Sequence, residues 1–293
     1  MKFIKIAVSC VLLIYVFNAV ELDWMFILHN NLSYNYFVFS AILISLTLLV
    51  GSLRWQTIIS HFGVDTCKYK LCRIFVRGNF WGQVLPGGGL GGDPIRVLQL
   101  NYLIQNKSLS IKSVILDRFS GLIINILISS AIAYYFIKRE IFDFKSDVLL
   151  FVDYFMPVLM IIIVIYCYWR HRLILITSIY SMLIFIAIGM AFYMCAIGLN
   201  TEINFWHCAF LFCIANVAKA FPFSVSGWGI REFVSLSLAP LLDLDEGVVL
   251  SVSVYYGVTV MLTAFFCWFV EVSTDRTSRA RNFQKINQKT DQP

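Results

Sequence analysis

The sequence predicts an all-α polytopic membrane protein with about six full transmembrane helices and two re-entrant broken hairpins. Of its 293 residues, 59% are hydrophobic and only 14% are charged, so several apolar stretches must be long enough to span a bilayer. Breaks rich in glycine or proline, at 77–96 and 221–232, interrupt two further apolar segments. Irregular backbone is tolerated at membrane depth only where protein buries it or where it lines a watery cavity.

The full spans are read from the apolar stretches in chain order. They are expected at about 6–20, 36–53, 114–137, 148–169, 173–197 and 247–270. The first follows two lysines but precedes no cleavage pattern, so we expect a retained helix and not a signal peptide. The second stops at Arg54 and Trp55, a charge and an aromatic residue typical of a membrane interface.

Loop charges give each span a direction. Residues 21–35 carry acidic side chains and no Lys or Arg, whereas basic side chains flank the stretch 71–92 and fill the tail after 270. By the positive-inside rule the basic segments and both chain termini are cytoplasmic. The stretch 71–92 should therefore enter and leave from the cytoplasmic face, and the broken segment 205–242 from the opposite face.

The chain is predicted to form a single transmembrane domain over 1–275, followed by a basic cytoplasmic tail over 276–293. Its halves, about 1–140 and 148–272, each hold two spans, a broken hairpin that ends in an arginine, and one more span. An odd number of crossings in each half would invert the second half relative to the first. Paired broken segments in inverted halves indicate a transporter's central site, so we expect the two breaks to meet near the midplane.

The first break predicts an anion site. Asp93 before Pro94 is a helix start, with the aspartate as N-cap, and the helix should run to about Ile104. The N-terminus of that helix carries partial positive charge, and Arg96 adds a guanidinium suited to phosphate. The expected backbone donors are those of Gly88, Gly91 and Gly92.

Three arginines are candidates to bind a lipid phosphate: Arg96, Arg118 and Arg231. Charge at membrane depth is kept mostly where it faces a cavity or a partner. The alternative is that each arginine forms a structural pair with a local carboxylate, Asp93, Asp117 or Glu232.

Further candidates for substrate binding surround these charges. They are Asp93, Glu232, Trp228, Gly229, and the pair Asn79 and Gln83, which share a helix face at a spacing of four. Each has a plainer alternative: a cap for the aspartate, an interfacial anchor for the tryptophan, and hydrogen bonding between helices for the two amides. Glycine at these breaks would then serve close helix packing alone.

Three motifs resemble the lysylphosphatidylglycerol synthase transmembrane (flippase-like domain) family. They are N-F-W-G-Q-V-L-P-G-G-G-L-G-G-D-P-I-R at 79–96, D-R-F-S-G at 117–121 and S-G-W-G-I-R-E at 226–232. The resemblance implies a stand-alone domain of the inner membrane with re-entrant helices that moves or holds lipids. We therefore expect no soluble synthetase domain of the kind that attaches lysine in some relatives. Pro94 stands where relatives often have a small residue.

We therefore expect a lipid flippase or translocator that binds an anionic headgroup, either a phospholipid or a polyprenyl-phosphate-linked glycan, in a central cavity. No catalytic motif, metal site, cofactor or nucleic-acid partner is expected. The partners would be membrane lipids, a second copy of the chain, or biosynthetic enzymes of the cell envelope. The alternative is a membrane-embedded enzyme or accessory subunit of a glycolipid or envelope-glycan pathway, with Asp93 or Asp117 as base or metal ligand.

Overall fold

The computed structural model describes residues 33–85, 91–136, 172–218 and 227–290, and every regular element in these ranges is helical. The helices are α3 (Tyr34–His61), α4 (Lys68–Val84), α5 (Asp93–Ile104), α6 (Lys107–Phe136), α8 (Arg172–Gly198), α9 (Phe205–Ala218), α10 (Ile230–Leu238), the 3-10 turn η3 (Pro240–Leu242) and α11 (Glu246–Thr290). Four of them contain stretches long and apolar enough to cross a membrane: Tyr34–His61, Lys107–Ile132, Arg172–Gly198 and Glu246–Thr274.

These four helices confirm the second, third, fifth and last predicted spans. The predicted spans at 6–20 and 148–169 lie outside the described residues. One predicted boundary was wrong: α3 does not stop before Arg54 but continues to His61, and both Arg54 and Trp55 are buried. Arg54 is buried within the helix because partners on other helices compensate its charge, which the local sequence does not reveal.

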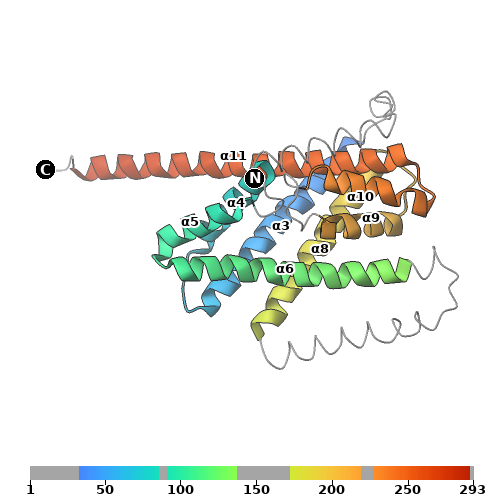
Figure 1. Cartoon of the computed structure of the whole chain (residues 1–293). Coiled ribbons are helices and arrows are strands. Elements are labelled where there is room, and N and C mark those ends of the chain that lie inside the picture. The colour runs from blue at the N-terminus through green and yellow to red at the C-terminus, as the bar shows by residue number, and fades with distance from the viewer. Residues whose placement is uncertain (1–32, 86–90, 137–171, 219–226, 291–293) are drawn as a thin grey trace.

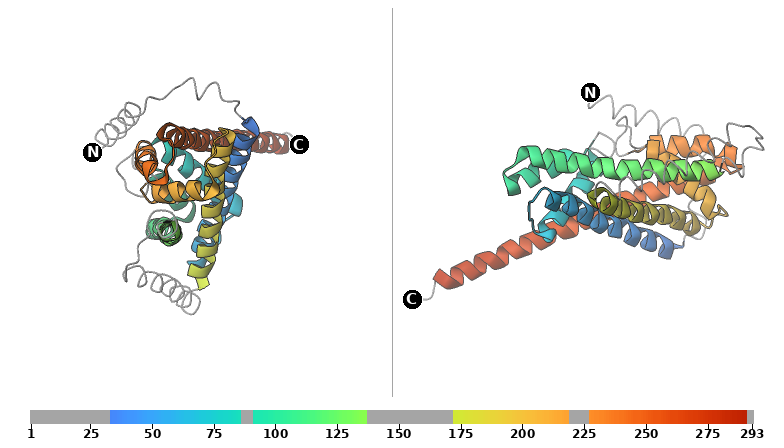
Figure 2. Two further views of the ribbon diagram at one scale, coloured as in Figure 1. Left: turned by 90° about the vertical axis from the view of Figure 1, so that its right-hand side faces the viewer. Right: turned by 90° about the horizontal axis from the view of Figure 1, so that it is seen from below.

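The described helices show the same order of long and short helices twice. A long helix (α3), two short ones (α4 and α5) and a long one (α6) are followed by a long helix (α8), two short ones (α9 and α10) and a long one (α11). In Figure 1, α4 and α5 lie toward the end of the bundle where α6 begins, and α9 and α10 lie toward the end where α11 begins. Figure 2 shows the same separation from below, and α11 projects beyond the other helices at its C-terminal end.

Short polar side chains mark where several helices begin. Asn106 accepts a hydrogen bond from the backbone N–H of Leu109 at the start of α6, at 3.0 Å. Asn204 caps α9 in the same way, and Asp245 caps α11 by accepting from Val248 at 2.8 Å. Each satisfies one of the backbone donors that a helix N-terminus leaves open, so these starts are encoded locally.

The two largest apolar cores hold most of the helices together. The smaller joins α3, α4, α5 and α6 around Trp55, Leu71 and Leu100, and the larger joins α8, α9 and α11. Large apolar side chains also cover the outside of the long helices, as with Ile42, Leu46 and Leu49 on α3. An outward apolar face on helices of this length is what a lipid surrounding requires.

Candidate functional site

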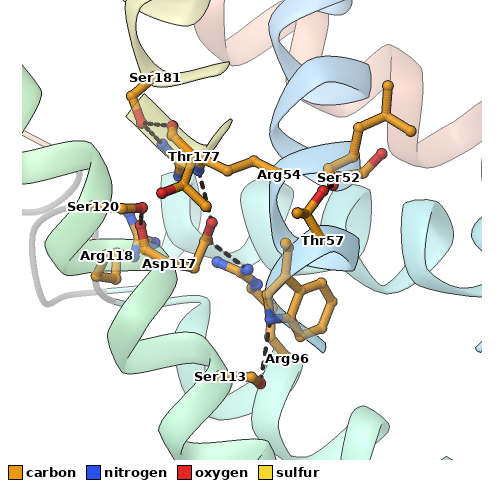
Figure 3. Close-up of polar contacts among 12 residues, drawn as sticks. Ser52, Arg54, Thr57, Arg96, Ser113, Asp117, Arg118, Ser120, Thr177 and Ser181 are labelled. Atoms are coloured by element: carbon orange, nitrogen blue, oxygen red, sulfur yellow. Dashed lines mark hydrogen bonds and ion pairs between the residues drawn. The ribbon is translucent and has the colours of Figure 1, made fainter. Parts of the chain in front are cut away.

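A cluster of charged side chains lies inside the bundle between four helices. The carboxylate of Asp117 on α6 accepts hydrogen bonds from Arg54 Nε on α3 at 2.8 Å and from Arg96 Nη2 on α5 at 2.7 Å. Arg54 also donates through Nη1 to the hydroxyl of Ser181 on α8, at 2.9 Å (Figure 3). We call Arg54, Arg96, Asp117 and the neighbouring pair Asp93 and Arg118 the first cluster.

Aromatic rings enclose the guanidinium of Arg96, which is only 3% exposed. It lies 4.3 Å from the centroid of the Trp55 ring and 4.6 Å from that of Phe75. The indole N–H of Trp55 donates to Ser113 Oγ at 3.3 Å, which fixes the ring's orientation. Cation–π contacts of this kind gain strength when water is excluded, so the two rings hold the Arg96 guanidinium in place.

Arg118 forms a second ion pair beside the first. Its Nε and Nη2 atoms donate to the Asp93 carboxylate at 2.8–3.0 Å, and its side chain is 43% exposed. Asp93 also lies 3.6 Å from Arg96 Nη1. The predicted N-cap role of Asp93 was wrong: Gly92 occupies the cap, and α5 begins at Asp93 without a side-chain cap. The Asp93 carboxylate accepts from the Arg118 guanidinium instead. The predicted helix end at Ile104 is confirmed.

Glycines bring the start of α5 against α4. A Cβ added to Gly92 would overlap the backbone carbonyl of Gly78, and one added to Gly91 would lie 2.8 Å from the carbonyl oxygen of Leu85. A Cβ at Gly78 would overlap the Arg96 side chain. Close packing therefore accounts for the presence of glycine at positions 92 and 78. Gly88 lies outside the described residues.

The first cluster carries an excess of positive charge. Three arginines (Arg54, Arg96 and Arg118) face two aspartates (Asp93 and Asp117), which leaves one net positive charge. Charge at membrane depth is kept mostly where it faces a cavity or a partner, and Arg118, with 43% of its side chain exposed, is the most accessible of the three arginines. Both aspartates already accept hydrogen bonds from guanidinium groups. No group of three His, Cys, Asp or Glu side chains suited to a metal ion occurs in the part of the chain that the structure describes.

A second cluster surrounds Arg231 at the start of α10. Arg231 pairs with Glu232 and donates through Nε to the hydroxyl of Ser253 on α11, at 3.2 Å. Its guanidinium lies 5.2 Å from the centroid of the Trp228 ring and 5.4 Å from that of Tyr256. All five side chains belong to what we call the second cluster.

The backbone before α10 positions Glu232. Gly229 has φ +86°, a conformation that favours glycine, and its N–H donates to Glu232 Oε2 at 2.8 Å. Glu232 therefore serves both as the partner of Arg231 and as the cap of its own helix. The space beside Arg231 leaves no volume for a water molecule; Phe192, Phe212, Ala215, Asn216 and Tyr256 line it.

The structure brings half of the predicted site residues into these two clusters. Arg96, Arg118 and Asp93 share the first, and Arg231, Glu232 and Trp228 share the second, beside Gly229, whose N–H donates to Glu232. Asn79 and Gln83 are half-buried on α4, and their proposed contact with a ligand stays a prediction. The meeting of the two breaks near the midplane also stays a prediction. In the structure, α5 packs on α4 and α6, whereas α10 packs on α9 and α11.

Two members of the first cluster were not among the predicted binding residues. The sequence predicts Arg54 as an interfacial charge, and Asp117 as a partner for an arginine or, in the enzyme alternative, as a base or metal ligand. The available signal was an ionisable residue inside an apolar segment, which marks a functional or paired position by default. That signal identifies such residues but does not say which of them meet.

Comparison with known proteins identifies one family. The model described as the lysylphosphatidylglycerol synthase TM region matches residues 2–179 and, in a second match, residues 167–266. The two matches together cover nearly the whole chain. No curated protein matches it.

Proposed function

Because the chain belongs to the lysylphosphatidylglycerol synthase transmembrane family and is an integral membrane protein, we propose that it translocates a lipid with an anionic headgroup. The lipid is a phospholipid or a polyprenyl-phosphate-linked glycan. The observation that carries the proposal is the pair of buried arginine clusters, each at the start of a short helix that follows a break in the chain.

The proposed architecture has six full spans, with α4–α5 and α9–α10 as re-entrant hairpins that enter from opposite faces. Helix lengths support it: α5, α9 and α10 have 12, 14 and 9 residues, so they reach only about 18, 21 and 14 Å, short of the hydrocarbon thickness of about 30 Å. The repeated order of long and short helices, and the opposite ends at which the short pairs lie, support an inverted repeat (Figure 1).

In the proposed mechanism the lipid phosphate replaces an internal carboxylate. Arg231 is paired with Glu232, and Arg96 with Asp117, so each guanidinium is already charged, oriented and shielded from water. A phosphate that enters either cluster competes for the same donors, because an arginine fork binds phosphate and carboxylate with similar geometry. In this mechanism the structure corresponds to a closed state, because the space beside Arg231 has no volume for a water molecule. Rocking of the two halves would open that space.

Lipid transport by purified protein tests this proposal. Proteoliposomes with labelled phosphatidylglycerol in both leaflets are assayed with wild type, Arg96→Gln and the double variant Arg231→Gln plus Glu232→Gln. The double variant removes both charges of the pair, so no buried glutamate is left without its cation. Arg172→Gln is the matched control, because Arg172 is exposed at the start of α8.

We expect the two cluster variants to lower the translocation rate at least tenfold and the control to keep the wild-type rate. Folded cluster variants that translocate lipid at the wild-type rate would refute the proposal. The alternative of an enzyme that uses Asp93 or Asp117 as base or metal ligand has less support, because guanidinium groups already occupy both carboxylates.

A further inference from the structure

A third group of charges lines a pocket that is separate from both clusters. The pocket has a volume of about 410 Å³ and lies between α4 and α5. Lys70, Arg73 and Arg77 of α4 contribute the charged wall, and Leu98, Gln99 and Tyr102 of α5 contribute to the facing wall. The three basic residues are spaced three or four apart, so they lie along one side of α4.

A carboxylate from α11, a helix far away in the sequence, binds two of the basic side chains of this wall. Glu271 of α11 accepts a hydrogen bond from Arg73 Nε at 2.5 Å and two from Arg77, through Nε and Nη2, each at 2.8 Å. Glu271 is buried, whereas both arginines are partly exposed. With Lys70 the group has three positive charges against one negative charge, so the pocket has a net charge of about +2 and attracts anions.

The pocket lies near a membrane boundary. Glu271 comes three residues before the end of the span Glu246–Thr274. Ser253 of the second cluster lies eighteen residues earlier on α11, a rise of about 27 Å, close to the hydrocarbon thickness of about 30 Å. The pocket and the second cluster therefore lie at opposite depths of the bundle.

The rim of the pocket is apolar and exposed. Leu98 and Tyr102 are 67% and 80% exposed although they lie beside three cations. Basic side chains next to exposed apolar and aromatic ones are typical of protein that contacts both lipid headgroups and acyl chains. The amide oxygen of Gln99 is buried and has no hydrogen-bond partner among the described residues. A headgroup hydroxyl would supply the missing donor.

We propose that this pocket binds the phosphate of an anionic phospholipid at the membrane boundary, with the acyl chains along Leu98 and Tyr102. Basic pockets between membrane helices bind such headgroups through the charges of Lys and Arg. The lipid phosphate contacts Lys70 and the guanidinium groups that Glu271 holds in place. This binding does not depend on whether the chain translocates lipid.

Native mass spectrometry of the full-length protein in detergent tests the site. The probes are dihexanoyl phosphatidylglycerol, dihexanoyl phosphatidylcholine and glycerol 3-phosphate, which separate the lipid from a soluble phosphate ester. One variant is Lys70→Gln, and a second combines Arg73→Gln, Arg77→Gln and Glu271→Gln so that no buried carboxylate loses its partners. Lys112→Gln is the control, because it removes one exposed lysine from α6, outside the pocket.

We expect wild type and Lys112→Gln to bind phosphatidylglycerol at least tenfold more tightly than phosphatidylcholine. Lys70→Gln should weaken that binding about fivefold, and the triple variant at least tenfold. Equal binding of the two lipids, or unchanged binding in both pocket variants, would overturn the proposal. Displacement of the lipid by glycerol 3-phosphate at similar concentration would overturn the lipid assignment and give the site to a soluble phosphate ester.

Discussion

The first cluster depends on a single carboxylate. Asp117 is buried between the guanidinium groups of Arg54 and Arg96, and it joins α3 and α5 to α6. Separating a buried charge from its partner is far more costly than the pair's net contribution to stability, because an uncompensated ion is left in a low dielectric. The chemistry of the site and the stability of the bundle are therefore coupled at this residue.

Asp117→Asn should lower the free energy of unfolding by about 3–5 kcal/mol, because it removes the charge of the carboxylate that the buried Arg54 and Arg96 share. Thermal unfolding in detergent, followed by tryptophan fluorescence, measures the effect. Ser120→Ala is the control on the same helix, since the Ser120 hydroxyl donates to the backbone carbonyl of Asp117 and not to its carboxylate. An Asp117→Asn protein that melts with the wild type would show that the cluster does not hold the helices together.

In the first broken segment, glycine allows two backbones to meet. The start of α5 lies on α4 because Gly92 and Gly78 leave no Cβ between them. That contact places Arg96, four residues after Gly92, against the ring of Trp55. The geometry of the first cluster therefore follows from the packing of α5 on α4.

Gly92→Ala should disrupt the α4–α5 contact, because its new Cβ would overlap a backbone carbonyl that no rotamer change can move. We expect a large loss of folded protein, measured by gel-filtration yield and unfolding midpoint. Gly189→Ala on α8 is the matched control, since its Cβ would meet Phe212 at an ordinary 3.6 Å. The idea fails if the two alanine variants behave alike.

For the whole molecule, the two short pairs lie toward opposite ends of the long helices (Figure 2). The charges of the loops predict that the α4–α5 end is cytoplasmic. The exposed residue Cys67, which precedes α4, can report this orientation directly. The pKa of the Cys67 thiol is lowered because backbone N–H groups of Lys70 and Tyr69 stabilise its thiolate.

Cys67 should react with a membrane-impermeant maleimide in inside-out vesicles and stay unmodified in right-side-out ones. Its lowered pKa shifts the rise in labelling rate to lower pH than for a free cysteine peptide, because the thiolate is the reactive form. Peptide mass spectrometry identifies the labelled site. The buried Cys195, Cys208 and Cys213 serve as internal controls that should react slowly. Labelling from the opposite side would reverse the proposed topology.

Much of the fold could be predicted because its determinants are local. Apolar length defines the spans that became α3, α6, α8 and α11, and glycine and proline define where the broken segments are interrupted. The site was predicted in part: Arg96, Arg118 and Asp93 were all identified as its members. The alternative of a local carboxylate as partner is confirmed for Arg231, which pairs with Glu232. Arg118 meets Asp93 and not its neighbour Asp117, because adjacent residues in a helix point in different directions.

By itself, the sequence determined that this chain crosses a membrane and where its long helices lie. It also determined that an arginine follows the break in each of the two interrupted apolar segments. Only the tertiary structure decided that Asp117 joins Arg54, 63 residues away, to Arg96, and that Asp93 turns to Arg118. The reason is that helix formation responds to neighbours in the chain, whereas a buried charge takes the partner that packing brings within hydrogen-bond distance, however far apart the two lie in sequence.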